Sequence, residues 1–488
     1  MSWSHHKLGV PTRRECLKAL ANTAIFTPAL LSGLVAAHEG PLPPLPDLPD
    51  TEALLLTPSD SRFARYEAAF NRRTMLPPKL RVLCKTPGAV ATVLEWLRFY
   101  RIPFALRSGG HCFEGFSQSG SVVVDTRLMK VVEIDAATGT VTTGPGASLG
   151  NLYKAASAHG YALPAGTCPT VGIAGHALGG GSGYLSRQFG FLCDTLQSIE
   201  YIDSNGRVVI GDAAQNKDLF WASRGGGGGS LGVVTCFRFQ LFPLRRVVAF
   251  TMEWSLPADQ ALTIVRAWQD WAPQAPEAIC STLTIALDPQ GHIWLECAGQ
   301  SVGSEDQLRR ELRGLLKLKR AHAGPLIKQM SFLGAINHFS EGLSYPSIYA
   351  KSKSDILLTP LCEEGIAVLF EGVQHLPKDE FTVVMYAYGG AIARISPSAT
   401  AFPYRDALGC IQYALSWDKP DKTHMRLLQL RNLYDSMRPY VSGGAYVNYC
   451  DTELKNWREA YWGPNLSRLE AIKSRLDPEN LFRHAQSI

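Results

Sequence analysis

Residues 107–111 read Arg-Ser-Gly-Gly-His and begin the first of three glycine-rich segments in this sequence. The second segment spans residues 166–183, and the third, residues 223–234, contains five glycines in a row. Because glycine has no Cβ and adopts positive φ readily, such loops let backbone N–H groups close around a pyrophosphate. Each segment alone is equally compatible with a tight turn between packed strands. The sequence has neither the Gly-Lys-Ser/Thr pattern of a P-loop nor a Rossmann Gly-x-Gly-x-x-Gly after its first strand.

Short β-type runs alternate with helical runs around the first glycine-rich segment. Residues 87–100 predict a helix, because their apolar side chains recur at spacings of three and four. Residues 148–159 predict another helix, with Ser148 as its N-cap. Strands are expected at residues 81–84, 103–107, 121–125 and 140–143. This part of the chain therefore reads as a mixed α+β domain, not as the regular strand–helix alternation of a dinucleotide fold.

The pattern changes across residues 247–440. Alternating runs such as residues 281–285 and 382–388 predict strands, and basic amphipathic helices are expected around residues 305–320. We predict an antiparallel sheet that is backed by helices. Residues 441–488 are expected to return to the first domain.

Composition limits the class of protein and its partners. The 488-residue chain is 46% hydrophobic and 19% charged, which is typical of a globular protein with a large core. A net charge of +5 is small for this length and there is no long Lys/Arg block, so no nucleic-acid partner is expected. The 11 cysteines are scattered without a Cys-x-x-Cys pair, which argues against a structural metal site. The sequence leaves open which cysteines pair.

Residues 1–37 are expected to be an export signal. Arg13-Arg14 precedes an apolar run of small residues, and Val35-Ala36-Ala37 suits a signal peptidase. The arginine pair resembles a twin-arginine signal, which engages the export machinery for folded proteins and implies a periplasmic or secreted protein. A membrane anchor or buried helix is the alternative, but Thr23 and Pro28 interrupt the run. We therefore expect no stable membrane insertion of the mature chain.

The three glycine-rich segments lie among motifs that together are far more specific than each is alone. In chain order these are Arg-Ser-Gly-Gly-His at 107–111, Cys-Pro-Thr-Val-Gly-Ile at 168–173, Leu-Phe-Trp at 219–221 before the glycine run, Tyr-Val-Asn-Tyr-Cys-Asp at 446–451, and Asp-Pro-Glu-Asn-Leu-Phe at 477–482. With these motifs the chain, from about residue 75 to its end, resembles the berberine bridge enzyme-like branch of the vanillyl-alcohol oxidase (PCMH-type) flavoprotein superfamily.

The resemblance implies an α+β fold with a two-part FAD-binding PCMH-type domain and an inserted substrate domain, an antiparallel sheet backed by helices. We place the parts as a signal at residues 1–37, a linker and the start of the FAD domain at 38–74, the FAD domain at 75–246, the substrate domain at 247–440, and a C-terminal berberine-bridge-type segment at 441–488.

The resemblance further implies FAD that is held by two covalent bonds. His111 would bond the 8α-methyl carbon of the isoalloxazine ring, and Cys168 would bond its C6 atom. Imidazole and thiolate are suitable nucleophiles for an electron-poor ring. Each residue alone would more simply be a loop histidine or a buried core thiol. Their motifs favour attachment, which should raise the flavin's redox potential and hold the ring in an open cleft.

Other residues of these motifs are expected to contact the flavin. The resemblance assigns Arg107, Ser108, Gly109 and Gly110 to the pyrophosphate loop, and Gly172, Gly175, His176, Ser182, Val234 and Asn448 to the rest of the cofactor site. His176 has no partner cluster that would make it a metal ligand, and no metal is expected. Val171 is a small residue at a position that is associated in the family with oxygen access, which favours an oxidase. Cys112 and Ala174 depart from the Asp and Gly that are usual there.

Tyr449 is the first choice for the catalytic base, as the resemblance suggests, and Tyr446 is the second. Strand-like alternation would put Tyr446 and Asn448 on one face and Tyr449 on the other. Tyr449 would take the proton of a substrate hydroxyl while a hydride passes from the same carbon to flavin N5. Oxygen, the electron acceptor, would then yield hydrogen peroxide. Because a free tyrosine ionises near pH 10, a cation or ring dipole would have to lower its pKa. A core aromatic is the alternative reading.

The substrate wall should come from the middle domain. Tyr386 and Tyr388 are expected to share a strand face, and Cys410, Gln412 and Tyr413 are further candidates, although ordinary sheet residues would look the same. Aromatic side chains beside a flavin suit a sugar face or a phenolic ring.

Three functions are compatible with these observations. The first is an exported FAD-dependent oxidase that acts on the CH–OH group of a small molecule, an oligosaccharide or a glycosylated or phenolic metabolite. The second is an oxidative tailoring enzyme that forms a ring or double bond in a natural product. The third is a secreted, non-catalytic binding protein on the same fold, against which His111, Cys168 and Tyr449 argue.

Overall fold

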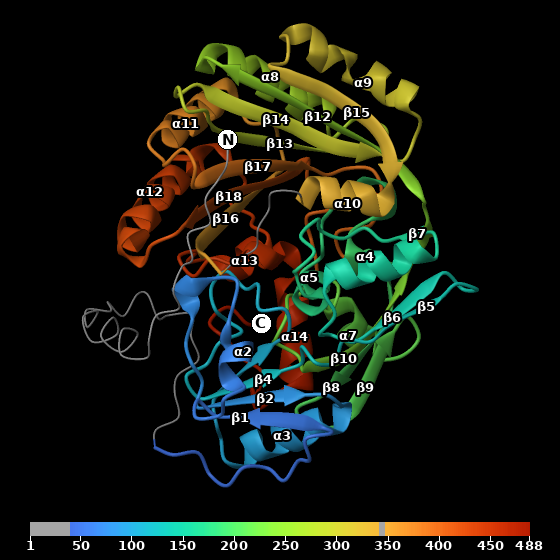
Figure 1. Ribbon diagram of the computed structural model, residues 1–488, viewed down its shortest axis with the longest axis vertical. Helices are drawn as coiled ribbons and strands as arrows, with labels where there is room; N and C mark the ends of the chain where they lie inside the picture. The colour runs from blue at the N-terminus through green and yellow to red at the C-terminus, as the bar shows by residue number, and fades with distance from the viewer. Residues whose placement is uncertain (1–39, 341–346) are drawn as a thin grey trace, which may run out of the picture.

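The computed structural model describes residues 40–340 and 347–488. The predicted export signal at residues 1–37 lies outside the described residues and stays a prediction. Two smaller sheets form the lower part of the molecule in Figure 1, and one large sheet forms the upper part. This combination of helices, a partly parallel sheet and antiparallel sheets confirms the predicted α+β class.

The two lower sheets are built differently. In the first, with strand order β1-β2-β4-β3, strands β2, β3 and β4 run parallel and β1 pairs antiparallel with β2. The second is antiparallel throughout, with the order β5-β6-β10-β8-β9. The strands are β1 (Ala53–Leu56), β2 (Leu80–Cys84), β3 (Phe104–Arg107), β4 (Val122–Asp125), β5 (Val132–Asp135), β6 (Thr140–Thr143), β8 (Leu196–Ile202), β9 (Val208–Asp212) and β10 (Val233–Gln240), and a separate short pair joins β7 (Tyr161–Ala162) to β11 (Phe242–Pro243).

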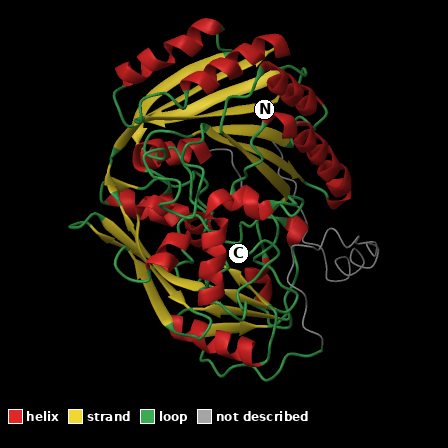
Figure 2. Cartoon of the chain, turned by 180° about the vertical axis from the view of Figure 1, so that it is seen from behind, coloured by secondary structure: helices red, strands yellow, loops and turns green. Residues whose placement is uncertain are grey.

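The upper sheet has seven antiparallel strands in the order β15-β12-β14-β13-β17-β18-β16. Helices α8, α9, α11 and α12 cover the face that points away from the rest of the molecule (Figure 2). The strands are β12 (Arg246–Leu256), β13 (Ile279–Leu287), β14 (Ile293–Ser301), β15 (Ala323–Ser331), β16 (Tyr349–Leu357), β17 (Phe381–Ala387) and β18 (Gly409–Trp417); the helices are α8 (Ala258–Trp271), α9 (Glu305–Leu318), α11 (Glu363–Gln374) and α12 (Thr423–Ser436). This is the predicted antiparallel sheet backed by helices.

The other helices lie mainly between and around the sheets. They are α2 (Phe63–Glu67), α3 (Pro87–Phe99), α4 (Leu149–Ala158), α5 (Ile173–Leu178), α6 (Ser186–Phe189), α7 (Lys217–Ala222), α10 (Phe332–Ser340), α13 (Trp457–Trp462) and α14 (Leu466–Leu476). Short 3-10 helices are η2 (Arg72–Thr74), η3 (Leu192–Thr195), η4 (Pro420–Lys422), η5 (Arg438–Tyr440), η6 (Val447–Tyr449) and η7 (Gly463–Asn465). No helix in the described part of the chain is both long enough and apolar enough for a membrane span.

Local sequence explains where α3 and α4 begin. The Thr86 hydroxyl accepts a hydrogen bond from the Ala89 N–H at 3.1 Å, and Pro87 occupies the first turn of α3. At α4, the Ser148 hydroxyl accepts from the Asn151 N–H at 3.3 Å. Both predicted helices are therefore confirmed, and the four predicted strands match β2, β3, β4 and β6 to within one residue at each end.

The C-terminal residues pack against the third glycine-rich segment. Helix α14 lies beside α7, and Lys473 Nζ donates hydrogen bonds to the carbonyls of Ser230 at 2.7 Å and Phe482 at 2.6 Å. The last residue, Ile488, donates its N–H to the Ser230 hydroxyl at 3.3 Å. The end of the chain therefore supports a loop that lies more than two hundred residues earlier in the sequence.

The upper sheet has one apolar face and one polar face. Side chains such as Phe250, Trp254 and Leu295 point into the core beneath the covering helices. Because side chains alternate along a strand, Glu253 and Glu296 point the other way, toward the lower part of the molecule. The polar face is therefore available to form the wall of a cavity.

Candidate functional site

A cavity of about 1290 Å³ lies between the lower sheets and the polar face of the upper sheet. Its walls come from all three glycine-rich segments, from residues 446–450 and from strands of the upper sheet. Of the site residues predicted above, those that line it are Arg107, Ser108, Gly109, Gly110, His111, Cys168, Gly172, Gly175, His176, Ser182, Val234, Tyr386, Gln412, Tyr446, Asn448 and Tyr449. The fold thus brings together motifs that are far apart in the sequence.

The first two glycine-rich segments touch through their backbones. A Cβ on Gly109 would lie 2.4 Å from the Gly172 nitrogen, so a side chain at this position would clash with backbone. Ser108 donates its hydroxyl hydrogen to the Pro145 carbonyl at 2.5 Å, which fixes the same loop from the other side. Arg107 is buried, and it donates to the Ala68 carbonyl and lies 3.8 Å from Asp125. The Arg107 guanidinium therefore holds the start of the first glycine-rich segment in place.

The glycine-lined part of the cavity fits a large flat cofactor. A Cβ on Gly175 would meet no atom within 4 Å, and one on Gly228 would meet only Leu178 and the Gly175 backbone at 3.6 Å and beyond. These glycines therefore leave open space where side chains would otherwise fill the cavity. The dimensions and the nearby nucleophiles are consistent with the dinucleotide flavin that the motifs imply.

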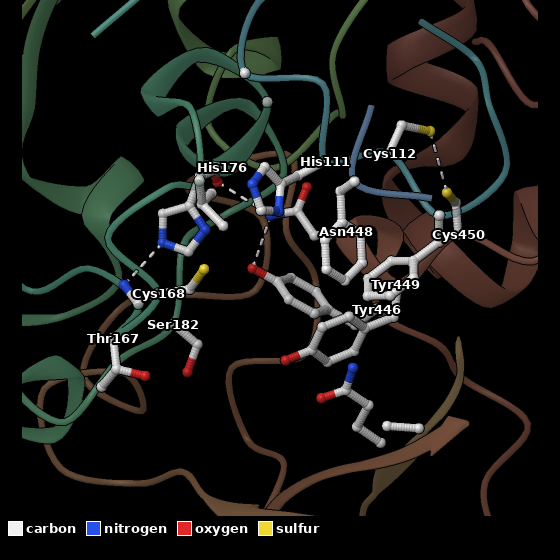
Figure 3. Close-up of a pocket in the computed structure, with 18 of the residues that line it drawn as sticks. His111, Cys112, Thr167, Cys168, His176, Ser182, Tyr446, Asn448, Tyr449 and Cys450 are labelled. Atoms are coloured by element: carbon white, nitrogen blue, oxygen red, sulfur yellow. Dashed lines mark hydrogen bonds between the residues drawn. The ribbon is translucent and has the colours of Figure 1, made fainter. Parts of the chain in front are cut away.

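His111 and Cys168 enter the cavity from different loops (Figure 3). The imidazole of His111 stacks on Phe70, with ring centroids 4.8 Å apart and an interplanar angle of 14°. Burial, together with the charge of Arg107, lowers the pKa of His111 to about 4, so the imidazole is neutral at physiological pH. Cys168 Sγ lies 3.4 Å from the Thr170 hydroxyl. A neutral imidazole and an accessible sulfur are thus available for bond formation.

His176 is neutral as well but is already engaged. Its Nε2 accepts the backbone N–H of Gly166 at 3.0 Å, and burial lowers its pKa to about 4. The proton of the neutral ring is therefore assigned to Nδ1. His176, in α5, thus holds Gly166 at the start of the second glycine-rich segment.

The predicted strand at residues 446–449 is wrong, because Val447–Tyr449 forms the 3-10 helix η6. Tyr446 and Tyr449 therefore do not point to opposite faces. Both line the cavity, with ring centroids 5.1 Å apart and nearly perpendicular planes (Figure 3). The Tyr446 hydroxyl accepts from the Gly181 N–H at 2.8 Å and from Asn448 Nδ2 at 3.0 Å, and Asn448 Nδ2 also donates to the His176 carbonyl at 3.0 Å.

Tyr449 belongs to a chain of hydrogen-bonding groups. It shares a hydrogen bond with Tyr386, and the Tyr386 hydroxyl donates to Gln412 Oε1 at 3.0 Å. Gln412 Nε2 in turn donates to the Ser352 hydroxyl at 3.1 Å. Burial raises the pKa of Tyr449 well above its ordinary value. Burial also raises the pKa of Tyr386 to about 12, against a smaller opposing effect of the Tyr449 hydroxyl. The lowered pKa that was expected for Tyr449 is thus not found among the protein groups.

Three candidates for the substrate wall lie outside the cavity, which corrects the prediction. Strand β17 ends at Ala387, so Tyr388 does not continue its alternation. Tyr388 is buried, packs against Phe191 at 5.2 Å, and its carbonyl accepts from Arg187. Cys410 is buried in the same cluster as Tyr388. Tyr413 lies on the other face of β18, where it packs edge-on against Tyr434.

Sequence reasoning missed a buried network of charges beside the site. Lys351 Nζ, on β16, lies 2.6 Å from Glu114 and 2.5 Å from Asp451. Lys353 lies 2.6 Å from Asp451, and Arg73 lies 2.9 Å from Glu114. Although burial opposes both shifts, these pairs raise the pKa of Lys351 and lower that of Asp451 to about 2. The network ties the loop that follows His111 to the segment that follows Tyr449.

Lys351→Met should lower the free energy of unfolding by about 3–5 kcal/mol, because Glu114 and Asp451, both buried, each lose one of the two cations that they face. The Lys351 side chain is 1% exposed, and methionine has no group that can take over its ion pairs. Urea unfolding, followed by intrinsic fluorescence, measures the change. Arg309→Ala is the matched control: its pair with Glu305 is exposed, and we expect a loss of only about 0.3–0.5 kcal/mol. Equal effects of the two changes would contradict the importance of the buried network.

Two carboxylates on the upper sheet were also missed. Glu253 on β12 lies directly opposite Glu296 on β14, and both line the cavity. Trp294 Nε1 donates to Glu253 Oε2 at 3.3 Å. Burial, with the neighbouring charge of Glu253, raises the pKa of Glu296. Glu253, Glu296 and the threonines of the same face thus offer hydrogen-bond acceptors to a ligand, and Trp294 offers a large aromatic ring. Alternation around residues 251–253 and 294–296 is the sequence signal that could have found them.

Comparisons with known proteins agree with this arrangement. Two family models match the chain: "FAD binding domain" at residues 78–211 and "Berberine and berberine like" at residues 445–488. An uncharacterized FAD-linked oxidoreductase, YgaK of Bacillus subtilis, is 33% identical over 440 residues, which cover 89% of this chain and 96% of YgaK.

Solved structures lead to the same group of proteins. The BBE-like 1 protein of Physcomitrella patens superposes with a TM-score of 0.81 at 30% identity, covering 89% of this chain and 96% of its own. A variant of Phl p 4 that is described as a glucose oxidase superposes with a TM-score of 0.82 at 27% identity, covering 90% and 97% of the two chains.

Proposed function

Because the chain belongs to the berberine bridge enzyme-like family of FAD-linked oxidoreductases, we propose that it is an oxidase of alcohol or hemiacetal carbons. The substrate would be a hydroxyl-rich or phenolic small molecule, and oxygen would be the electron acceptor. The observation that carries the proposal is that His111, Cys168 and the Tyr446–Tyr449 pair line one cavity. The polar wall with Glu253, Glu296 and Trp294 favours a sugar-type ligand, and a structural relative is described as a glucose oxidase.

His111 and Cys168 would hold FAD covalently. The neutral imidazole of His111 has a free lone pair at physiological pH, as attachment requires, and Phe70 keeps the ring in place by stacking. The loop at residues 108–110 and the third glycine-rich segment would surround the rest of the cofactor. When bound, FAD supplies the acceptor for a hydride from the substrate carbon and the site at which oxygen is reduced to hydrogen peroxide.

Tyr449 would accept the hydroxyl proton of the substrate. The ionised phenolate oxygen would take this proton, and Tyr386 lies beside it as its hydrogen-bonding neighbour. Gln412 fixes the direction of this chain because its Oε1 can only accept from Tyr386 while its Nε2 donates to Ser352. Tyr446 would position Asn448 and the Gly181 backbone, with which its hydroxyl is already engaged.

Turnover should therefore rise with pH. A base is active in its ionised form, and burial raises the pKa of Tyr449 above its ordinary value. We expect log(kcat/KM) to increase with pH from neutrality up to about pH 10, without a plateau below that value. Stopped-flow measurement of substrate-dependent flavin reduction across this range checks the slope. A bell-shaped profile that is centred near pH 7 would contradict Tyr449 as the base.

Two measurements on the purified protein test the proposed function. Yellow colour that remains with the polypeptide after acid precipitation tests covalent FAD. Peroxide release across a panel of mono- and oligosaccharides, simple alcohols and phenols tests the oxidase activity and its substrate class. Tightly bound flavin without peroxide from any member of the panel, under air, would argue against an oxidase. Colourless protein would support the non-catalytic alternative.

A further inference from the structure

Two cysteines from distant parts of the sequence face each other at the edge of the cavity. Cys112 Sγ lies 3.8 Å from Cys450 Sγ, although the residues are 338 positions apart (Figure 3). Both residues line the cavity. Cys112 directly follows His111, and Cys450 directly follows Tyr449. Any bond between the two sulfurs would therefore join the loop proposed to hold the cofactor to the segment proposed to move the substrate's proton.

The two thiols differ in their electrostatic surroundings. The hydrogen bond from Cys450 lowers the pKa of Cys112 against the opposing effect of burial, and the backbone N–H of Phe116 also donates to its sulfur at 3.3 Å. The same contact and, as the second cause, burial raise the pKa of the Cys450 thiol. Cys112 is therefore the more acidic of the two thiols, and thiolates are the form that oxidants attack. By contrast, burial raises the pKa of a core thiol such as Cys84 to about 12.

Both cysteines lie outside the regular helices and strands. A disulfide needs a separation of about 2.05 Å, so the two sulfurs must move closer together. Cys112 lies in a loop, and Cys450 lies just after η6, so neither residue is fixed within a regular helix or strand. The cavity gives a small oxidant a path to both sulfurs.

We propose that Cys112 and Cys450 are a modification site, at which hydrogen peroxide forms a disulfide between the His111 loop and the Tyr449 segment. The Cys112 sulfur attacks one oxygen of the peroxide and the O–O bond breaks, which gives a sulfenic acid and one water. The Cys450 sulfur then attacks the Cys112 sulfur, the S–S bond forms, and the S–O bond breaks with release of a second water. Two thiols lose two electrons in total, and one peroxide is reduced. This site does not depend on the proposed oxidase activity, because added peroxide supplies the oxidant.

Differential alkylation of the full-length protein tests the site. The protein is reduced, freed of reductant, treated with increasing hydrogen peroxide, alkylated, and digested without reduction for mass spectrometry. We expect a peptide that links Cys112 to Cys450 and the loss of two alkylated thiols per chain. Cys362 should still be alkylated at the same dose, although its thiol is exposed. Hydrogen exchange at residues 107–116 and 445–451 should slow at least several-fold after oxidation.

Single variants separate the two steps. Cys450→Ser should stop the reaction at a sulfenic acid on Cys112, which dimedone traps, and Cys112→Ser should leave Cys450 reduced. Cys362→Ser is the control and should form the same link as the wild type. If Cys362 is oxidised at an equal or lower peroxide dose, or if the link joins other cysteines, the proposal is wrong. The wild-type titration decides this even if a serine variant fails to fold.

Discussion

Tyr449→Phe should lower kcat by about 10²–10⁴-fold while the protein stays folded and keeps its FAD. The substitution removes only the hydroxyl, and the ring can still pack against Tyr446 at the same place. The hydroxyl is the group that shares a hydrogen bond with Tyr386 and that would receive the substrate proton. The loss should appear in the rate of flavin reduction under anaerobic conditions, since oxygen reacts only in the later step. Substrate binding should change much less than kcat.

Tyr388→Phe is the matched control for this change. Tyr388 is also a buried tyrosine that the sequence suggested for the site, but the structure places it outside the cavity, packed against Phe191. We expect its rate of flavin reduction to stay within about twofold of the wild-type rate. Loss of a hydroxyl that lies away from the cavity should act mainly on the stability of the protein. A Tyr449→Phe enzyme with the flavin reduction rate of the wild type would rule out Tyr449 as the base and leave Tyr446 as the candidate.

Local signals made the fold predictable. The helix at Pro87–Phe99 could be predicted because its apolar spacing, its N-cap at Thr86 and its first-turn proline all agree. The glycine motifs were informative for another reason: the backbone contact between Gly109 and Gly172 leaves no room for a Cβ, so the structure requires glycine there. Such requirements are visible in the sequence because they restrict residue type at single positions.

Interactions that form only in three dimensions were not predictable. Residues 351–355 read Lys-Ser-Lys-Ser-Asp, a wholly polar run that would normally be placed at the surface, yet the structure buries all five. Glu114 and Asp451, which pair with Lys351, come from distant segments of the chain. No local sequence pattern therefore predicts the network. The prediction of a strand at residues 446–449 was wrong for a related reason. The hydrogen bonds of Tyr446 and Asn448 to the second glycine-rich segment accompany a tight 3-10 turn there in place of the extended strand that alternation suggested.

Removal of both proposed attachment residues should abolish covalent flavin completely. In a His111→Ala, Cys168→Ala double variant, acid precipitation should leave the polypeptide colourless, and its intact mass should lack one FAD. Each single variant should keep acid-stable flavin through the remaining bond, because the two residues enter the cavity from different loops and each would form its own bond to the ring. The single variants should also differ in absorption spectrum, since one lacks the imidazole and the other the sulfur substituent on the ring.

His176→Gln is the control that makes this result specific to His111. His176 lines the same cavity and is equally neutral, but its Nε2 already accepts the Gly166 N–H, and a glutamine oxygen can take over that hydrogen bond. We expect this variant to retain the full mass of one covalent FAD. If the double variant kept acid-stable flavin, another nucleophile would have to bind the ring. If wild-type protein that contains FAD released all of it in acid, His111 and Cys168 would be contact residues only. The stacked, neutral imidazole of His111 argues for the covalent outcome, because a pKa of about 4 leaves its lone pair available at neutral pH.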